Sequence, residues 1–134
     1  MFEKIRSNAQ LAHFLLYFAS YGIYGVLLAV SGPVVPFMAA KYGLPETDFI
    51  FMFWCKALGF VIGGFLTKLL QRFLTFHEML FYSSLFIATC FMLFPFIFSI
   101  PFQGALILLG ATACSVFEII LLMCYMEAFK GNEE

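Results

Sequence analysis

The stretch FIFMFWCKALGFVIGGFL, residues 49–66, decides the class of this protein. Lys56 is the single charged residue in this stretch. Together with its flanking residues, the stretch is about 20 residues long, which is the length of a helix that crosses a bilayer. A lysine inside such a run costs roughly 2.5–3.5 kcal/mol on insertion scales. The stretch therefore indicates a transmembrane helix, and Lys56 needs a reason to be there.

The composition of the whole chain leads to the same class. Of 134 residues, 63% are hydrophobic and 11% are charged. A soluble domain of this size has too much surface to hide so much apolar area, so we expect an integral membrane protein. With a net charge of −1, the chain lacks the excess of basic residues that is typical of nucleic-acid-binding proteins.

Four apolar runs are long enough to cross a membrane, and lipid forces each of them to be helical. They cover about 11–31, 49–70, 78–98 and 102–129. We expect Gly32-Pro33 to end the first helix, Pro45 to open the second and Pro95 to kink the third. The predicted fold is all-α: one domain, residues 1–134, forming an antiparallel bundle of four transmembrane helices.

The basic residues predict the orientation of the bundle. With four spans, five of them fall on one side of the membrane: Lys4, Arg6, Lys68, Arg72 and Lys130. The other side has Lys41, close to Glu46 and Asp48. The positive-inside rule then places both termini in the cytoplasm, or in the matrix of a mitochondrion.

Small residues form a stripe on several of the predicted helices, and such stripes let helix backbones approach closely in lipid. The expected packing positions are Gly22, Gly25, Gly59, Gly63, Gly64 and Gly110. Two interpretations stay open, because the stripes suit packing within the chain as well as docking of another subunit.

Lys56 and Glu118 are the clearly intramembrane charges. At about 1.5 Å per residue, Lys56 lies roughly 10 Å and Glu118 roughly 24 Å below the outer ends of their helices. A direct pair within the chain, pairing with other subunits, and a proton or substrate site are the three alternatives.

The sequence carries no motif that predicts an enzyme or a metal centre. The cysteines Cys55, Cys90, Cys114 and Cys124 lie in apolar runs without zinc-ligand spacing, and we interpret them as small apolar residues. His13 and His77 lie at similar depth, but at the membrane interface, where solvated histidines are expected rather than haem ligands. We expect no cofactor.

Residues 32–48, GPVVPFMAAKYGLPETD, resemble the first loop of major facilitator superfamily transporters, in which a G-P-x-x-P motif ends the first helix. Residues 58–66, LGFVIGGFL, resemble the glycine-rich second helix of that family, nearest to its sodium-dependent glucose transporter-like branch. The resemblance implies the first four helices of a six-helix half, in a fold that transports small solutes by alternating access.

The loop after the second helix departs from the family pattern. In residues 64–72, GFLTKLLQR, Lys68 replaces the family's acid and Gln71 replaces its second glycine. In the family that acid takes part in latching the inward face, and the cation Lys68 cannot replace it in this role. We therefore expect a non-catalytic accessory subunit of a larger membrane complex, and the host that we expect is a respiratory assembly of the mitochondrial inner membrane. The alternative is a small-solute transporter, either a homo-oligomer or part of a split carrier.

The expected partners are other membrane subunits and lipids. Four basic residues on the inner side, Lys4, Arg6, Lys68 and Arg72, are candidates for binding anionic head groups such as cardiolipin. The ordinary alternative is that these residues only set the topology.

Overall fold

The computed structural model describes residues 2–97 and 99–130, and this part of the chain folds as helices joined by short turns. The side chains of residues 2–14, 27, 28, 30, 31 and 128–130 lie outside the description. The elements are α1 (Phe2–Tyr42), the 3₁₀ turn η1 (Glu46–Phe49), α2 (Ile50–Leu70), α3 (Phe76–Leu93), the 3₁₀ turn η2 (Phe94–Phe96) and α4 (Ile100–Lys130). The prediction of an all-α chain is confirmed.

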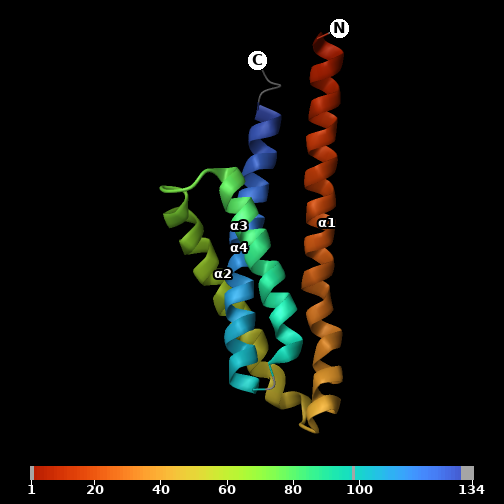
Figure 1. Ribbon diagram of the computed structural model, residues 1–134, viewed down its shortest axis with the longest axis vertical. Helices are drawn as coiled ribbons and strands as arrows, with labels where there is room; N and C mark the ends of the chain where they lie inside the picture. Colours follow the sequence, from red (N-terminus) through yellow and green to blue (C-terminus); the bar gives the residue numbers. More distant parts are fainter. Residues whose placement is uncertain (1, 98, 131–134) are drawn as a thin grey trace.

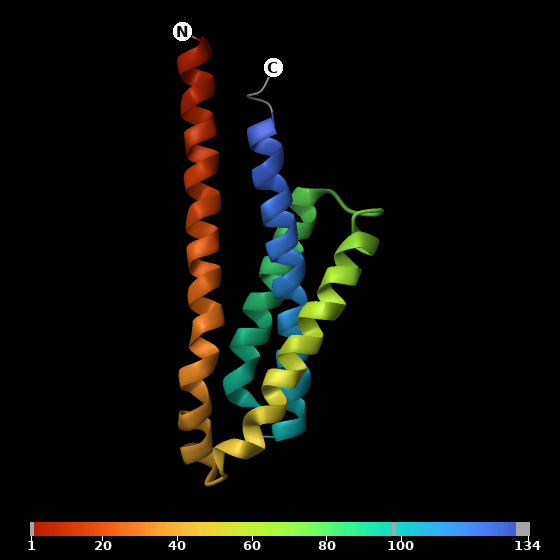
Figure 2. The ribbon, with the colours of Figure 1, turned by 180° about the vertical axis from the view of Figure 1, so that it is seen from behind.

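The four helices run alternately up and down the long axis of the molecule (Figure 1). The start of α1, the turn between α2 and α3 and the end of α4 point to one end, and the other two turns lie at the opposite end. α4 packs against α1, α2 and α3 and is therefore the central element. Figure 2 shows from behind that α1 extends beyond the α2–α3 turn.

Three segments are long and apolar enough to cross a membrane, namely Glu46–Leu70, Phe76–Phe96 and Ile100–Glu127. The described apolar section of α1, Leu15–Val26, is shorter than a span. Large apolar side chains cover the outside of the molecule, and Phe65, for example, is 77% exposed. Such a surface suits a membrane environment, since a protein in water rarely exposes extensive apolar patches.

The end of the first helix differs from the sequence-based expectation. α1 does not stop at Gly32-Pro33 but continues through Pro33 and Pro36 to Tyr42. A proline removes one backbone donor and leaves the other helical bonds in place, and apolar surroundings make a complete break more costly than that loss. The helix ends instead at Tyr42, because the next residue, Gly43, has a φ of 64° that is easy only for glycine. Leu44 N–H then donates to Ala39 O at 3.1 Å.

The third helix starts two residues before the predicted position 78. Thr75 caps it: the hydroxyl of Thr75 accepts from Glu78 N–H, and the Glu78 carboxylate accepts from Thr75 N–H at 2.9 Å. This reciprocal pair satisfies two amide donors at the start of α3. At its other end, α3 tightens into η2 around Pro95.

The closest helix contact joins α2 to α4 at two glycines. A Cβ atom placed on Gly59 would lie 2.5 Å from the carbonyl oxygen of Leu108, and one on Gly63 would lie 2.5 Å from that of Thr112. Both positions therefore require glycine. The approach also allows Ser115 Oγ to donate to the carbonyl of Phe60 at 3.0 Å.

Candidate functional site

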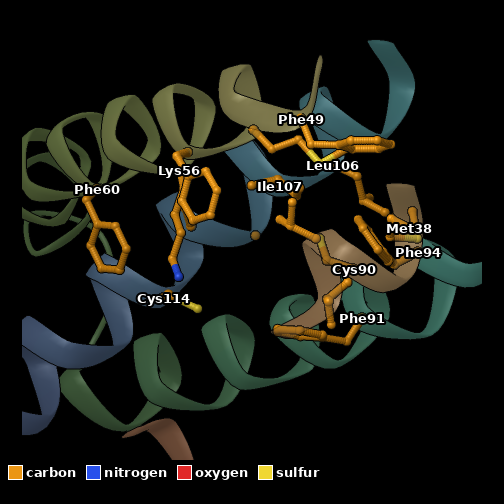
Figure 3. Close-up of a pocket in the computed structure, with 16 residues that line it drawn as sticks. Met38, Phe49, Lys56, Phe60, Cys90, Phe91, Phe94, Leu106, Ile107 and Cys114 are labelled. Atoms are coloured by element: carbon orange, nitrogen blue, oxygen red, sulfur yellow. The ribbon is translucent and has the colours of Figure 1, made fainter. Parts of the chain in front are cut away.

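A cavity of about 200 Å³ lies where the four helices face one another (Figure 3). α1 contributes Val34, Val35 and Met38 to its wall. The remaining wall residues are Phe49, Met52, Phe53, Lys56, Phe60, Cys90, Phe91, Phe94, Leu106, Ile107, Gly110, Ala111 and Cys114. The wall is thus almost entirely apolar and rich in phenylalanine.

Lys56 is the one charged residue among the described residues that line this cavity. It follows the start of α2 at Ile50 by six residues, which is about 9 Å along the helix. Its side chain is half-buried and extends from α2 toward α4, where Nζ lies beside the side chain of Cys114 (Figure 3). The lysine therefore brings an ammonium group into an otherwise apolar space.

Glu118 lies one helical turn beyond Cys114 on α4 and has different surroundings. Its carboxylate accepts from Tyr24 Oη at 3.0 Å and from Tyr21 Oη at 3.4 Å. Tyr24 is only 3% exposed, and its ring packs against Phe117 at a centroid distance of 6.2 Å. These contacts form one polar link between α1 and α4, and Gln103 Nε2 on α4 forms another by donating to Tyr42 Oη on α1 at 3.0 Å.

Sequence analysis did not identify the two tyrosines as partners of Glu118. A signal was present, because Tyr21 and Tyr24 are three residues apart and share one face of the first helix. What the sequence does not reveal is which helix faces α4 at this depth.

The predicted packing glycines fall into two groups. Gly59 and Gly63 face α4, and a Cβ on Gly110 would lie 3.5 Å from Cys90 Cβ on α3. Gly22, Gly25 and Gly64 are open, because no atom of a neighbouring element in the described part of the chain lies within 4 Å of an added Cβ. Gly104, which sequence analysis did not single out, lies against the ring of Phe51.

The candidate lipid-binding residues are described only in part. Lys68 in the last turn of α2 and Arg72 in the following turn are exposed at the same end of the molecule. The side chains of Lys4 and Arg6 lie outside the described residues, as does that of His13. His77 is exposed in the first turn of α3.

No group of three or more metal-ligating side chains gathers among the described residues. Comparison with protein-family models, with curated proteins and with solved structures found no match to the chain.

Proposed function

We propose that the chain is a non-catalytic membrane subunit that packs against a larger membrane assembly through α1. The observation that carries this proposal is the open face of α1 at Gly22 and Gly25, where no described residue occupies the space beside the glycines. Neighbouring positions on this helix are apolar and exposed, such as Phe18 at 70% and Ile23 at 65%.

The chain itself provides a comparison for what such glycines do. At Gly59 and Gly63 the backbone of α4 fills the space that a side chain would take. Helices in lipid associate through this kind of close packing, because apolar side chains alone gain little by leaving the lipid tails. Open glycines on α1 therefore favour an external helix as the partner.

The proposed orientation in the membrane is based on the positions of the basic residues. The proposed orientation has both termini on the inner side, together with Lys68 and Arg72, and α1 serves as the fourth span. The proposed host is a respiratory assembly of the mitochondrial inner membrane, because such assemblies contain many small helical subunits. Cardiolipin is the proposed lipid partner of the inner basic residues.

A second candidate function is transport of a small solute, with a fold of the major facilitator type. Two features favour transport: the cavity that Lys56 lines, and the resemblance of residues 32–48 to the first loop of major facilitator transporters. In that case a second chain, or further copies of this one, would complete the solute path, because four helices form less than one half of that fold.

The native mass of the tagged chain in mild detergent, with mass spectrometry of its companions, tests the proposal. We expect a complex of fixed composition. A Gly22→Leu, Gly25→Leu double variant should release the chain from it, because leucine blocks close approach at α1. Gly64→Leu, at an open glycine on α2, is the matched control and should leave the complex intact.

A homo-oligomer without a stoichiometric partner would contradict the subunit proposal and favour the transporter. Retention of the complex in the Gly22→Leu, Gly25→Leu double variant would show that α1 is not the docking helix.

A further inference from the structure

We propose that Glu118 binds a lysine or arginine side chain from a transmembrane helix of the partner subunit. This inference rests on the proposed subunit role, and it names the chemistry by which the partner is recognised at the α1–α4 contact.

Glu118 lies well inside the apolar part of α4. It is nine residues, or about 14 Å, from the end of the apolar segment Ile100–Glu127. Its described hydrogen-bond partners are the hydroxyls of Tyr21 and Tyr24. Hydroxyl groups are neutral, so they satisfy acceptor sites without balancing a negative charge. A charge at this depth is costly unless an opposite charge balances it, and a cation from outside the chain would do so.

The carboxylate of Glu118 has room for a further donor. Its two oxygens offer about four acceptor sites, and each tyrosine hydroxyl takes one. The two contacts are also unequal, because Tyr24 Oη lies 3.0 Å from Oε2, whereas Tyr21 Oη lies 3.4 Å from Oε1. Glu118 is half-buried, so its own chain does not seal it. Oε1 is therefore the atom to which we assign the external ammonium or guanidinium group.

The exposure of the two tyrosines indicates the side from which the partner approaches. Tyr24 is 3% exposed and Tyr21 is 41% exposed, so the carboxylate is accessible past Tyr21. Gly25 lies one turn after Tyr21 on the same helix face, and no atom of another described element lies within 4 Å of a Cβ added there. Because α1 stands at the edge of the bundle (Figure 2), a helix of another subunit can lie along α1 at the level of Glu118.

A lysine or arginine suits this position for a geometric reason. Both residues carry their charge at the end of a long apolar stem, which can cross from a neighbouring helix through an apolar layer. A second copy of this chain does not present such a side chain, because Lys56 is half-buried and extends toward Cys114 inside its own bundle (Figure 3). The proposed partner is therefore a different membrane protein.

Neutralising Glu118 tests the assignment in the complex purified with the tagged chain in mild detergent. Glu118→Gln keeps the size of the side chain and an acceptor for the tyrosines, and it removes the charge. We expect the fraction of the chain that retains its partner to fall by at least about tenfold, because the partner's cation is then left unpaired at the interface. Glu127→Gln removes an exposed carboxylate from the same helix and is the matched control, which should retain the complex. Far-UV circular dichroism checks that both variants are folded.

A crosslinking experiment identifies the cation itself. Benzoylphenylalanine in place of Tyr21 is activated by light in the assembled complex, and mass spectrometry identifies the partner segment that it captures. We expect a transmembrane helix that contains a lysine or arginine, and replacement of that residue by methionine should release the wild-type chain to the same extent as Glu118→Gln. This substitution leaves the present chain unchanged, so it decides the question even if Glu118→Gln does not fold.

The outcomes separate this inference from the subunit proposal. A complex that survives Glu118→Gln but not the Gly22→Leu, Gly25→Leu double variant would overturn the assignment of Glu118 and leave the subunit role intact. A captured segment without a basic residue, or equal loss of the complex in Glu127→Gln, would overturn the assignment as well. Absence of any complex with the wild-type chain would contradict both proposals.

Discussion

Glu118 and Lys56 illustrate two ways to accommodate a charge inside an apolar helical bundle. Glu118 accepts hydrogen bonds from Tyr24 and Tyr21 across the α1–α4 contact. Lys56 extends into a cavity beside Cys114. The carboxylate thus contributes to holding two helices together, whereas the lysine forms part of the wall of a largely apolar cavity.

The strength of the tyrosine contact can be tested directly. Tyr24→Phe removes the hydroxyl that donates at 3.0 Å and leaves the ring in place. We expect the free energy of unfolding to fall by about 1 kcal/mol, because hydrogen bonds between transmembrane helices contribute about 0.6 kcal/mol on average and up to about 1.7. Unfolding in mixed detergent, followed by circular dichroism, gives the value.

Tyr21→Phe is the matched control for this prediction. Its hydroxyl lies farther away, at 3.4 Å, and its side chain is more exposed, so a smaller loss is expected. Equal losses in the two variants would contradict the assignment of Tyr24 as the principal partner of Glu118.

At the scale of elements, the α2–α4 contact depends on the absence of two side chains. The backbones approach so closely that any Cβ at Gly59 or Gly63 would overlap with α4. The neighbouring Gly64 faces open space, although it belongs to the same turn of α2. Within one turn of α2, position 63 therefore has no room for a side chain, whereas position 64 has.

This difference predicts opposite effects of the same substitution at adjacent positions. Gly63→Ala should lower the free energy of unfolding by about 1–3 kcal/mol, since the added methyl forces α2 away from α4. Gly64→Ala should leave it unchanged or raise it by up to about 1 kcal/mol, because alanine favours the helix more than glycine does. The thermal midpoints of the two purified variants provide the measurement, and a similar fall in both would be inconsistent with the packing.

The elements also show how far the sequence could predict this structure. The ends of the second, third and fourth helices were predicted within a few residues. The signals for them, Pro45, Pro95 and the apolar runs, depend only on neighbouring residues in the sequence. The end of the first helix was missed, because Gly32-Pro33 signals a break locally that the surrounding helix overrides. Gly59 and Gly63 indicated close packing but not its partner, which depends on how whole helices meet.

The candidate site was harder to predict than the helices. The sequence singled out Lys56 and Glu118 by their charge, but it did not predict a cavity, since cavities depend on side chains from all four helices. The contact between Tyr24 and Glu118 joins residues 94 positions apart. A contact of that kind depends on the relative depth and rotation of two helices, which local patterns do not encode.

At the scale of the whole molecule, the two ends differ in their basic residues, although the end with more of them also carries Glu78 and Glu127. Lys68 and Arg72 lie at the end where α1 starts and α4 finishes, and Glu46 and Asp48 lie at the other end with Lys41. An up-and-down bundle with such a division has one favoured orientation in a membrane, because basic residues are retained on the inner side. On this rule we expect the end that carries Lys68 and Arg72 to face inward.

Cysteine labelling tests this orientation. In a variant whose four native cysteines are replaced by alanine, Thr47→Cys and Phe73→Cys each introduce one exposed thiol, at opposite ends of α2. A membrane-impermeant maleimide added to sealed, right-side-out membranes should label position 47 at once and position 73 only after permeabilisation. The two sites are matched controls for each other, since both are exposed and lie just outside the ends of the same helix. Labelling of both without permeabilisation would mean that α2 does not cross the membrane, and the reverse pattern would mean that acidic Glu46 and Asp48, not the basic end, face inward.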